Sequence, residues 1–158
     1  MKLSIVIPAY NEARTIQTVL DRVNQSLDGF HEIVVVDDAS KDETAALVKM
    51  RADADPRIRL LQHERNAGKT AALRTGFAAI TGDVVVIQDA DLEYDPADIP
   101  DLIEPILQDR GDVSLGSRFL VKRSRPDSVL SPLPGKQVSN VSQQRAHRFE
   151  LYGCRDRL

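Results

Sequence analysis

Four β-branched residues stand in a row at Ile33-Val-Val-Val36, and a second such run is Val84-Val-Val-Ile87. Neither run alternates apolar with polar residues, as a strand with one solvated face would. Uninterrupted runs are typical of strands covered on both faces, as in parallel sheets whose crossover helices lie on either side. The two runs therefore predict a mainly parallel sheet between layers of helix.

Further apolar runs and helix-period segments alternate around these two. We expect strands at Leu3–Pro8, Glu32–Val36, Ile58–Gln62, Asp83–Gln88 and Val113–Gly116. We expect helices at Ala13–Leu27, Asp42–Ala52, Lys69–Ile80 and Ala97–Gln108. Ser40-Lys-Asp-Glu43 is interpreted as a capping box for the second helix, and Gly82 as the stop signal of the third. The alternation of strand and helix predicts the α/β fold class with right-handed crossovers.

Composition limits the class of protein. A chain of 158 residues fits one domain that buries its own core. The single cysteine, Cys154, excludes a disulfide framework and a cysteine-based zinc site, which fits a reducing compartment such as the cytoplasm. No apolar run approaches the roughly 20 residues that span a bilayer, so we expect no transmembrane segment.

Charge divides the chain into two parts. Residues 1–120 carry 13 Lys and Arg against 21 Asp and Glu, whereas residues 121–158 carry 8 against 3. The acidic part argues against nucleic acid as a partner, because phosphate backbones select basic surfaces. We therefore expect a ligand-binding domain over 1–120 and an irregular, poorly ordered basic tail over 121–158. A linker and an interaction tail are both open alternatives for the latter.

Polar clusters follow three of the predicted strands. They are Pro8-Ala-Tyr-Asn-Glu12, Asp37-Asp-Ala-Ser40 and Asp89-Ala-Asp-Leu-Glu93. Each cluster alone is also explained by a turn or a helix cap. Ligands of open parallel sheets bind at the carboxyl ends of the strands, so the three clusters together predict a binding site at that edge.

The last cluster suggests a metal ion. Asp89, Asp91 and Glu93 are spaced at i, i+2 and i+4, and on extended backbone they would point the same way. Crowded carboxylates favour a bound cation, and oxygen ligands suit Mg²⁺ or Mn²⁺ bridged to substrate phosphates. A calcium EF-hand is excluded, because Tyr94 stands where that loop needs Gly and Pro100 where it needs Glu.

Other candidate motifs are weaker. Gly68-Lys-Thr70 looks like the end of a P-loop, but the first glycine of that motif would fall on His63. The histidines have no metal-ligand spacing, and we expect His31 and His63 to be surface or strand-edge residues. Lys69 and Arg118 are candidates for contact with a diphosphate, with a surface ion pair as the alternative for each.

Taken together, the motifs resemble those of the family 2 glycosyltransferases. The resemblance covers residues 3–120 and rests on Pro8-Ala-Tyr-Asn-Glu12, Val36-Asp-Asp-Ala-Ser40 with Asp42 and Thr44, Asn66-Ala-Gly-Lys69 and Asp89-Ala-Asp91. Gln88–Pro96 and Gly116-Ser-Arg-Phe119 are most similar to the polyprenyl-phosphate sugar transferases, a group that includes the dolichyl-phosphate mannose synthases.

The resemblance implies a GT-A fold and inverting transfer of a sugar from a nucleotide donor, GDP-mannose or a UDP-hexose. The acceptor would be a polyprenyl or dolichyl phosphate, reached by peripheral contact with the membrane. The implied donor-binding residues are Pro8, Tyr10, Glu12, Val36, Asp38, Lys69, Asp89, Ala90, Asp91 and Arg118. The implied metal ligands are Asp89, Asp91 and Glu93, and the implied catalytic residues are Asp91 and Arg118. Glu93 stands where the mannose synthases usually have glutamine, and Thr70 where glycine is common.

The chemistry leaves two functional interpretations. A divalent cation would stabilise the charge on the departing nucleoside diphosphate, and an ionised lipid phosphate would need no strong general base. Beyond Leu120 the family pattern stops, and we hypothesise that the reading frame shifts near residues 121–130 or that the chain is a fragment. The chain is thus either an active transferase or a catalytically incomplete nucleotide-sugar-binding remnant. A plain doubly wound regulatory or interaction domain is the alternative from another class.

Overall fold

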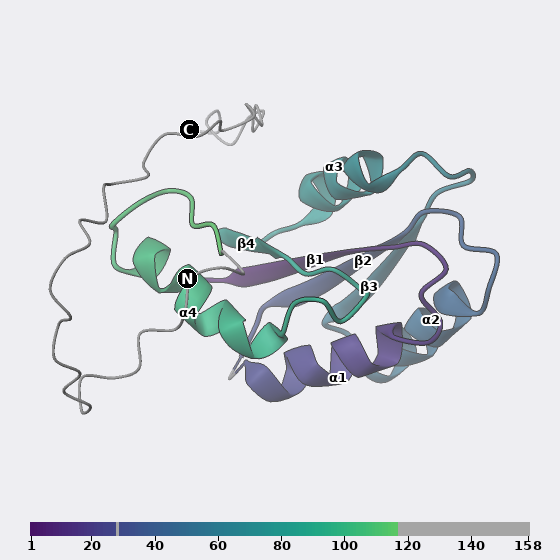
Figure 1. The fold of residues 1–158 in the computed structure, drawn as a ribbon, viewed down its shortest axis with the longest axis horizontal. Helices are drawn as coiled ribbons and strands as arrows, with labels where there is room; N and C mark the ends of the chain where they lie inside the picture. The colour runs from purple at the N-terminus through teal and green to yellow at the C-terminus, as the bar shows by residue number, and fades with distance from the viewer. Residues whose placement is uncertain (28, 117–158) are drawn as a thin grey trace, which may run out of the picture. The chain divides into compact units, whose positions relative to one another are not determined.

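The computed structural model describes residues 1–27 and 29–116, which form a sheet covered by helices on both faces (Figure 1). The sheet has four strands in the order β3-β2-β1-β4, and all pairs are parallel. The strands are β1 (Leu3–Ala9), β2 (Glu32–Asp37), β3 (Ile58–Gln62) and β4 (Val84–Ile87). The predicted parallel sheet is therefore confirmed.

Four α-helices and one short 3₁₀ helix lie around the sheet. They are α1 (Ile16–Ser26), α2 (Thr44–Ala54), α3 (Lys69–Ala79), η1 (Pro96–Asp98) and α4 (Ile99–Leu107). Figure 1 shows α3 alone on one face, with α1, α2 and α4 on the other. Both faces of β1 and β2 are consequently covered, which is why their residues are almost all buried and do not alternate with polar ones.

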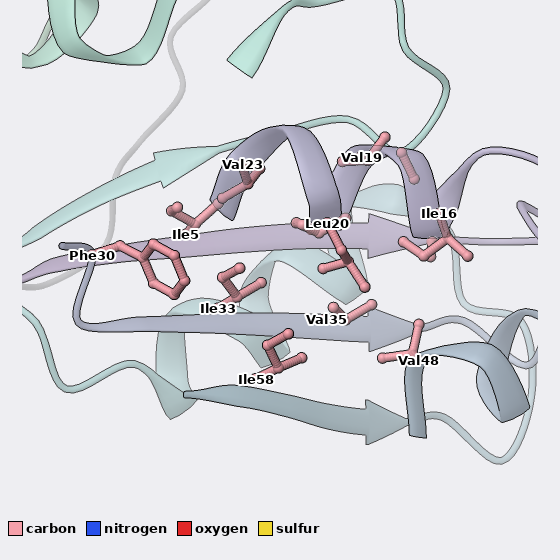
Figure 2. Close-up of a cluster of buried hydrophobic side chains, with 13 residues drawn as sticks. Ile5, Ile16, Val19, Leu20, Val23, Phe30, Ile33, Val35, Val48 and Ile58 are labelled. Atoms are coloured by element: carbon pink, nitrogen blue, oxygen red, sulfur yellow. The ribbon is translucent and has the colours of Figure 1, made fainter. Parts of the chain in front are cut away.

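The main core lies between β1, β2 and α1 (Figure 2). α1 buries Ile16, Val19, Leu20 and Val23, whose spacing puts them on one stripe of the helix. Each such side chain removed from water contributes about 1.5–3 kcal/mol. On the opposite face, Val34 and Val36 of the sheet pack against Ala72 of α3.

Two glycines allow close approach between elements. A Cβ at Gly76 of α3 would collide with Cγ1 of Val6, so α3 lies directly on β1. A Cβ at Gly82 would collide with the Ser4 hydroxyl and lie 2.8 Å from the Lys2 carbonyl oxygen. The interpretation of Gly82 as a helix stop is wrong. α3 ends at Ala79 with extended backbone at Ile80, and Gly82 is needed instead where the chain passes β1.

The predicted strand at Val113–Gly116 is wrong. No β-strand is formed there, and Val113 and Leu115 are exposed. A strand is stabilised by hydrogen bonds to a neighbouring strand, and this segment pairs with no strand among residues 1–27 and 29–116. An apolar run alone is therefore not sufficient to form a strand.

The predicted capping box is also wrong. The Ser40 hydroxyl accepts a hydrogen bond from the Asn11 N–H at 2.9 Å, and the Glu43 side chain makes no capping hydrogen bond. The first turn of α2 is held by Asp42, whose Oδ1 accepts from the Thr44 N–H at 3.0 Å. The Ser40 side chain is thus used in a tertiary contact with the loop after β1 and does not cap α2.

A buried carboxylate ties the amino-terminal edge of the sheet together. Glu32, 5% exposed, accepts hydrogen bonds from the Ser4 hydroxyl, from the backbone and hydroxyl of Thr81, and from Arg59. Burial by itself raises the pKa of Glu32, but these hydrogen bonds outweigh it and lower the pKa to about 2. Glu32 is therefore a charged, fully partnered group inside the fold.

Within the part of the chain that the structure describes, no helix is long and apolar enough to cross a membrane. The basic tail predicted over 121–158 and the candidate Arg118 lie outside the described residues.

Candidate functional site

A cavity of about 400 Å³ opens at the carboxyl ends of β1, β2 and β4, beside the start of α3. Its size falls in the range of small-molecule sites. The lining residues are Pro8, Ala9, Tyr10, Glu12, Asp38, Asn66, Gly68, Lys69, Ala72, Asp89, Ala90 and Asp91. The three polar clusters, which are separate in sequence, thus meet at one cavity.

Eight of the ten predicted donor-binding residues line this cavity, and so do two of the three predicted metal ligands. Val36 is fully buried beneath it, where it packs against the lining residue Ala72. Glu93 lies in the loop after β4 without lining the cavity. Arg118 lies outside the described residues.

The loops after β1 and β2 are joined to each other by hydrogen bonds. The Glu12 N–H donates to the Thr44 hydroxyl at 2.8 Å, and the Ala13 N–H donates to Asp42 Oδ2 at 3.1 Å. Burial alone raises the pKa of Asp42, but hydrogen bonds from Thr44 and Ala13 outweigh it and lower the pKa. Asp42 and Thr44 therefore hold the cavity wall in place and do not line the cavity.

Asp38 holds the loop between β3 and α3. Its carboxylate, 4% exposed, accepts from the N–H of Gly68 at 2.7 Å and from the N–H of Ala67 at 2.9 Å. It also contacts His63 Nδ1 at 2.6 Å. Burial alone raises the pKa of Asp38, and the hydrogen bonds from Ala67, His63 and Gly68 outweigh it and lower the pKa. The carboxylate is thus ionised and faces the cavity.

On the β4 side, a lysine faces a carboxylate across the cavity. Lys69 Nζ lies 2.7 Å from Asp89 Oδ1 and 2.8 Å from Oδ2. Lys69 is the first residue of α3, so its ammonium group adds to the partial positive charge of the helix N-terminus. This side of the cavity therefore offers both cationic and anionic groups to a ligand that carries phosphates.

The carboxylates of the loop after β4 do not lie on extended backbone, so that expectation is wrong. β4 ends at Ile87, and Leu92 has φ 65°. Asp91 Oδ1 accepts a hydrogen bond from the Glu93 N–H at 3.0 Å, which makes a local turn. The turn breaks the two-residue periodicity that would have aligned Asp89, Asp91 and Glu93.

The residues present fit a cation shared with a ligand. Among residues 1–27 and 29–116, no group of three or more His, Cys, Asp or Glu side chains is arranged to hold a metal ion. Two carboxylates, Asp89 and Asp91, nevertheless line the cavity. Mg²⁺ is commonly held by one or two carboxylates together with substrate phosphates, so this donor set suits Mg²⁺ or Mn²⁺ bound with a diphosphate.

Two residues of the site were not predicted from the sequence. Gln88, 3% exposed, donates to the backbone carbonyls of Asp89 and Tyr94 at 3.1 Å and so fixes the loop after β4. His63 was expected at the surface or at a strand edge; it directly follows β3 and bridges Asp38 and Thr75. Both residues directly follow a strand, which is the positional signal that singled out the other polar clusters.

The loops after β1, β2 and β4 each contain a residue other than glycine in the left-handed region. These are Asn11 with φ 56°, Ala39 with φ 59° and Leu92 with φ 65°. Asparagine adopts this conformation more readily than alanine or leucine. Strained backbone concentrates at ligand sites, which agrees with the location of the cavity.

Comparison with known proteins shows matching sequences. The sequence model of "Glycosyl transferase family 2" matches residues 4–156, so the family match continues beyond Leu120, where the motifs had predicted that it stops. The undecaprenyl-phosphate 4-deoxy-4-formamido-L-arabinose transferase of Sodalis glossinidius is 35% identical over 97% of this chain and 47% of its own length. The dolichol-phosphate mannosyltransferase of Pyrococcus furiosus is 37% identical over 76% of this chain and 34% of its own length.

Solved structures show the same fold. Glucosyl-3-phosphoglycerate synthase from Mycobacterium tuberculosis, in complex with Mn²⁺, UDP and glucosyl-3-phosphoglycerate, matches with a TM-score of 0.55 and 35% identity. The match covers 67% of this chain and 39% of that one. A mannosyltransferase from Pyrobaculum calidifontis in complex with GDP-Man and Mn²⁺ gives the same TM-score and identity over 61% and 29% of the two chains. The GT-A fold is therefore confirmed, and this chain spans less than half the length of these relatives.

Proposed function

Because this chain belongs to glycosyl transferase family 2, we propose that it binds a nucleoside-diphosphate sugar in the cavity at the carboxyl ends of β1, β2 and β4. One observation carries the proposal. The family motifs, far apart in sequence, line a single cavity that is acidic at both ends and has a lysine at a helix N-terminus. GDP-mannose and UDP-hexoses are the candidate donors.

The order of the strands suggests how the donor lies. β1 separates β2 from β4, so Asp38 and Asp89 stand on opposite sides of the cavity. Asp38, with Pro8, Tyr10 and Glu12, suits the nucleoside, because a carboxylate accepts hydrogen bonds from base N–H groups. Lys69 suits the diphosphate. Val36 lies beneath the cavity and contributes to donor binding indirectly, by packing against the lining residue Ala72.

Asp89 and Asp91 would hold Mg²⁺ or Mn²⁺ together with the donor phosphates. When bound, the cation stabilises negative charge on the departing nucleoside diphosphate. We assign the catalytic role of the chain to Asp91 and Arg118, since Arg118 matches by motif the arginine that contacts the donor phosphates in the family. Glu93 lies close enough in sequence to adjust the charge around Asp91, and it is a secondary candidate for metal contact.

We propose that the acceptor is a lipid phosphate, whose oxygen attacks the anomeric carbon of the sugar with inversion and displaces the nucleoside diphosphate. The arabinose transferase and the mannosyltransferase among the relatives are named for undecaprenyl phosphate and dolichol phosphate. A phosphate oxygen is already ionised near neutral pH, so attack needs no strong general base. The enzyme would then work in the cytoplasm, at the surface of a membrane.

Donor binding without transfer is the second candidate. Its support is that the cavity, with Asp89 and Asp91 for a cation, accounts for donor binding by itself. A domain that holds the donor alone would contain the cavity described here and lack residues for the acceptor.

Calorimetric titration of the 158-residue chain with GDP-mannose and UDP-glucose, with and without Mn²⁺, tests donor binding. We expect binding of one donor to depend on Mn²⁺. We expect Asp91→Asn to weaken it at least tenfold, because a charge-assisted contact is worth about 1.5–3 kcal/mol. Asp53→Asn makes the same charge change on the exposed surface of α2 and should leave affinity unaltered.

Absence of any metal-dependent donor binding would refute the proposal. A separate transfer assay with a polyprenyl phosphate distinguishes the two candidates. Product formation that Asp91→Asn abolishes supports the transferase, whereas tight donor binding without product supports the binding domain.

A further inference from the structure

A chain of three side chains runs beneath the nucleoside side of the cavity. His63 Nδ1 lies 2.6 Å from Asp38 Oδ1, and His63 Nε2 lies 2.9 Å from the Thr75 hydroxyl. The His63 side chain is 17% exposed and that of Asp38 4%. His63 follows β3, Asp38 follows β2, and Thr75 belongs to α3, so the chain joins three elements.

The direction of the hydrogen bonds follows from the chemistry of the groups. An ionised carboxylate only accepts hydrogen bonds, so the proton of the imidazole lies on Nδ1. In the neutral ring Nε2 is then an acceptor, which the Thr75 hydroxyl can satisfy as donor. Both ring nitrogens are therefore partnered, and the ring is held in one orientation.

A hydroxyl, an imidazole and a carboxylate in series also occur in hydrolases, but the surroundings of Thr75 do not suit a nucleophile. Thr75 lies inside α3, where backbone N–H groups are engaged in the helix. Acyl transfer requires free donors for an oxyanion, whereas the N–H groups of α3 around Thr75 are used by the helix itself. The chain is better suited to hold Asp38.

His63 determines which oxygen of Asp38 is available. Oδ1 accepts from His63 and from the Ala67 N–H, whereas Oδ2 accepts from the Gly68 N–H at 2.7 Å and only distantly from Ala67, at 3.2 Å. A carboxylate oxygen accepts about two hydrogen bonds. Oδ1 is therefore saturated. Oδ2 has one short hydrogen bond and the longer arm of the Ala67 N–H that Oδ1 shares, so a further donor can replace that arm.

We propose that His63 is a positioning residue of the donor pocket. It holds Oδ1 of Asp38 so that Oδ2 presents one acceptor position to an N–H group of the nucleobase. The inference rests on the proposed function, and it adds a residue that does not itself line the cavity. The effect of His63 on binding is confined to ligands that carry a nucleobase.

Two substitutions divide the contacts of His63 between them. The amide nitrogen of asparagine lies near the position of Nδ1, so His63→Asn retains a donor to Asp38 and loses Thr75. The longer glutamine places its amide near Nε2, so His63→Gln retains a contact with Thr75 and loses Asp38. Thr75→Val removes the hydroxyl and leaves the bond between His63 and Asp38.

The test measures binding of GDP and UDP in saturating Mn²⁺ by calorimetry, with Mn²⁺-pyrophosphate as a ligand without a base. For the nucleotide that the wild type prefers, we expect His63→Gln to weaken binding about tenfold. His63→Asn and Thr75→Val should stay within about threefold of wild type. Pyrophosphate should bind all variants alike, and urea melts check that each variant is folded.

Equal losses in His63→Asn and His63→Gln would overturn the inference, since they would indicate a structural role alone. A parallel loss of pyrophosphate binding would also overturn it. If His63→Gln does not fold, the other two variants decide: retained nucleotide affinity supports the inference, and a tenfold loss in Thr75→Val contradicts it. Failure of the wild type to bind either nucleotide refutes the proposed function itself, which is a different result.

Discussion

At the scale of single residues, buried carboxylates organise both ends of the sheet. Asp38 holds the loop that carries Lys69 to the cavity, and Glu32 holds the opposite edge together. Sequence analysis identified Asp38 from its position after a strand and found no role for Glu32. The partners of Glu32 come from residues 4, 59 and 81, so no local pattern could have indicated them.

Glu32→Gln is expected to destabilise the fold and to change how stability depends on pH. The folded pKa of about 2 lies below the usual 4.5, so the stabilisation is present above pH 4.5 and is lost as pH falls toward 2. At pH 7 the substitution should lower the free energy of unfolding by about 2–3 kcal/mol. Urea denaturation of wild type and variant at pH 7 and pH 3 measures both effects.

The wild type should lose more stability than Glu32→Gln between those two pH values. Glu64→Gln, at an exposed position after β3, serves as the control and should follow the wild type. If the stability of wild type and Glu32→Gln depended on pH in the same way, the assignment of this pH dependence to Glu32 would be contradicted.

At the scale of elements, most helices and strands could be predicted from the periodicity of apolar residues. The residues at which they begin and end depended on contacts with the rest of the fold. The bounds of β3 were predicted as Ile58–Gln62 and are confirmed. α1 begins at Ile16, three residues later than predicted, because the backbone before it forms a turn in which the Glu12 carbonyl accepts from Thr15 and Ile16. The segment 113–116 was predicted as a strand and is not one, since pairing decides what an apolar run becomes.

Gly76→Ala should destabilise the protein although alanine is the better helix former. The new Cβ would collide with Val6 Cγ1, so α3 must move away from β1. Overpacking of this kind costs about 1–3 kcal/mol, which exceeds the gain of about 1 kcal/mol in helix propensity. Thermal and urea unfolding measure the net effect.

Val6→Ala removes the colliding methyl group and provides the matched variant. In the double variant the two losses should not add, because the shortened side chain leaves room for the new Cβ. Simple additivity would show that α3 accommodates the methyl group in another way.

At the scale of the whole molecule, the described residues form a sheet with one incompletely covered strand. β4 pairs with β1 only, among residues 1–27 and 29–116, and on the α3 side its Val85 and Ile87 are 38% and 46% exposed. Exposed apolar edge strands pair with other chains. The exposure of β4 results from its position at the edge of the sheet. Its sequence does not indicate it, because β4 is as apolar as the buried β2.

Ile87→Lys should reduce self-association at high protein concentration and leave the melting temperature nearly unaltered. A charge on an exposed edge strand opposes pairing with another chain, and exposed substitutions usually change stability by less than about 0.5 kcal/mol. Sedimentation velocity over a range of concentrations measures the association. Leu107→Lys, at an exposed position on α4, is the control and should have the smaller effect.

The sequence by itself determined the parallel sheet, the three polar clusters and the family, because each depends on residue types at short spacing. Ile33-Val-Val-Val36 could be recognised as a strand buried on both faces without any knowledge of its neighbours. Tertiary structure alone decided that Ser40 contacts Asn11, that Asp91 lies in a turn, and that His63 reaches Asp38 and Thr75. The physical reason is that a polar side chain takes the partner that folding brings near, and that partner can be 12 or 29 residues away.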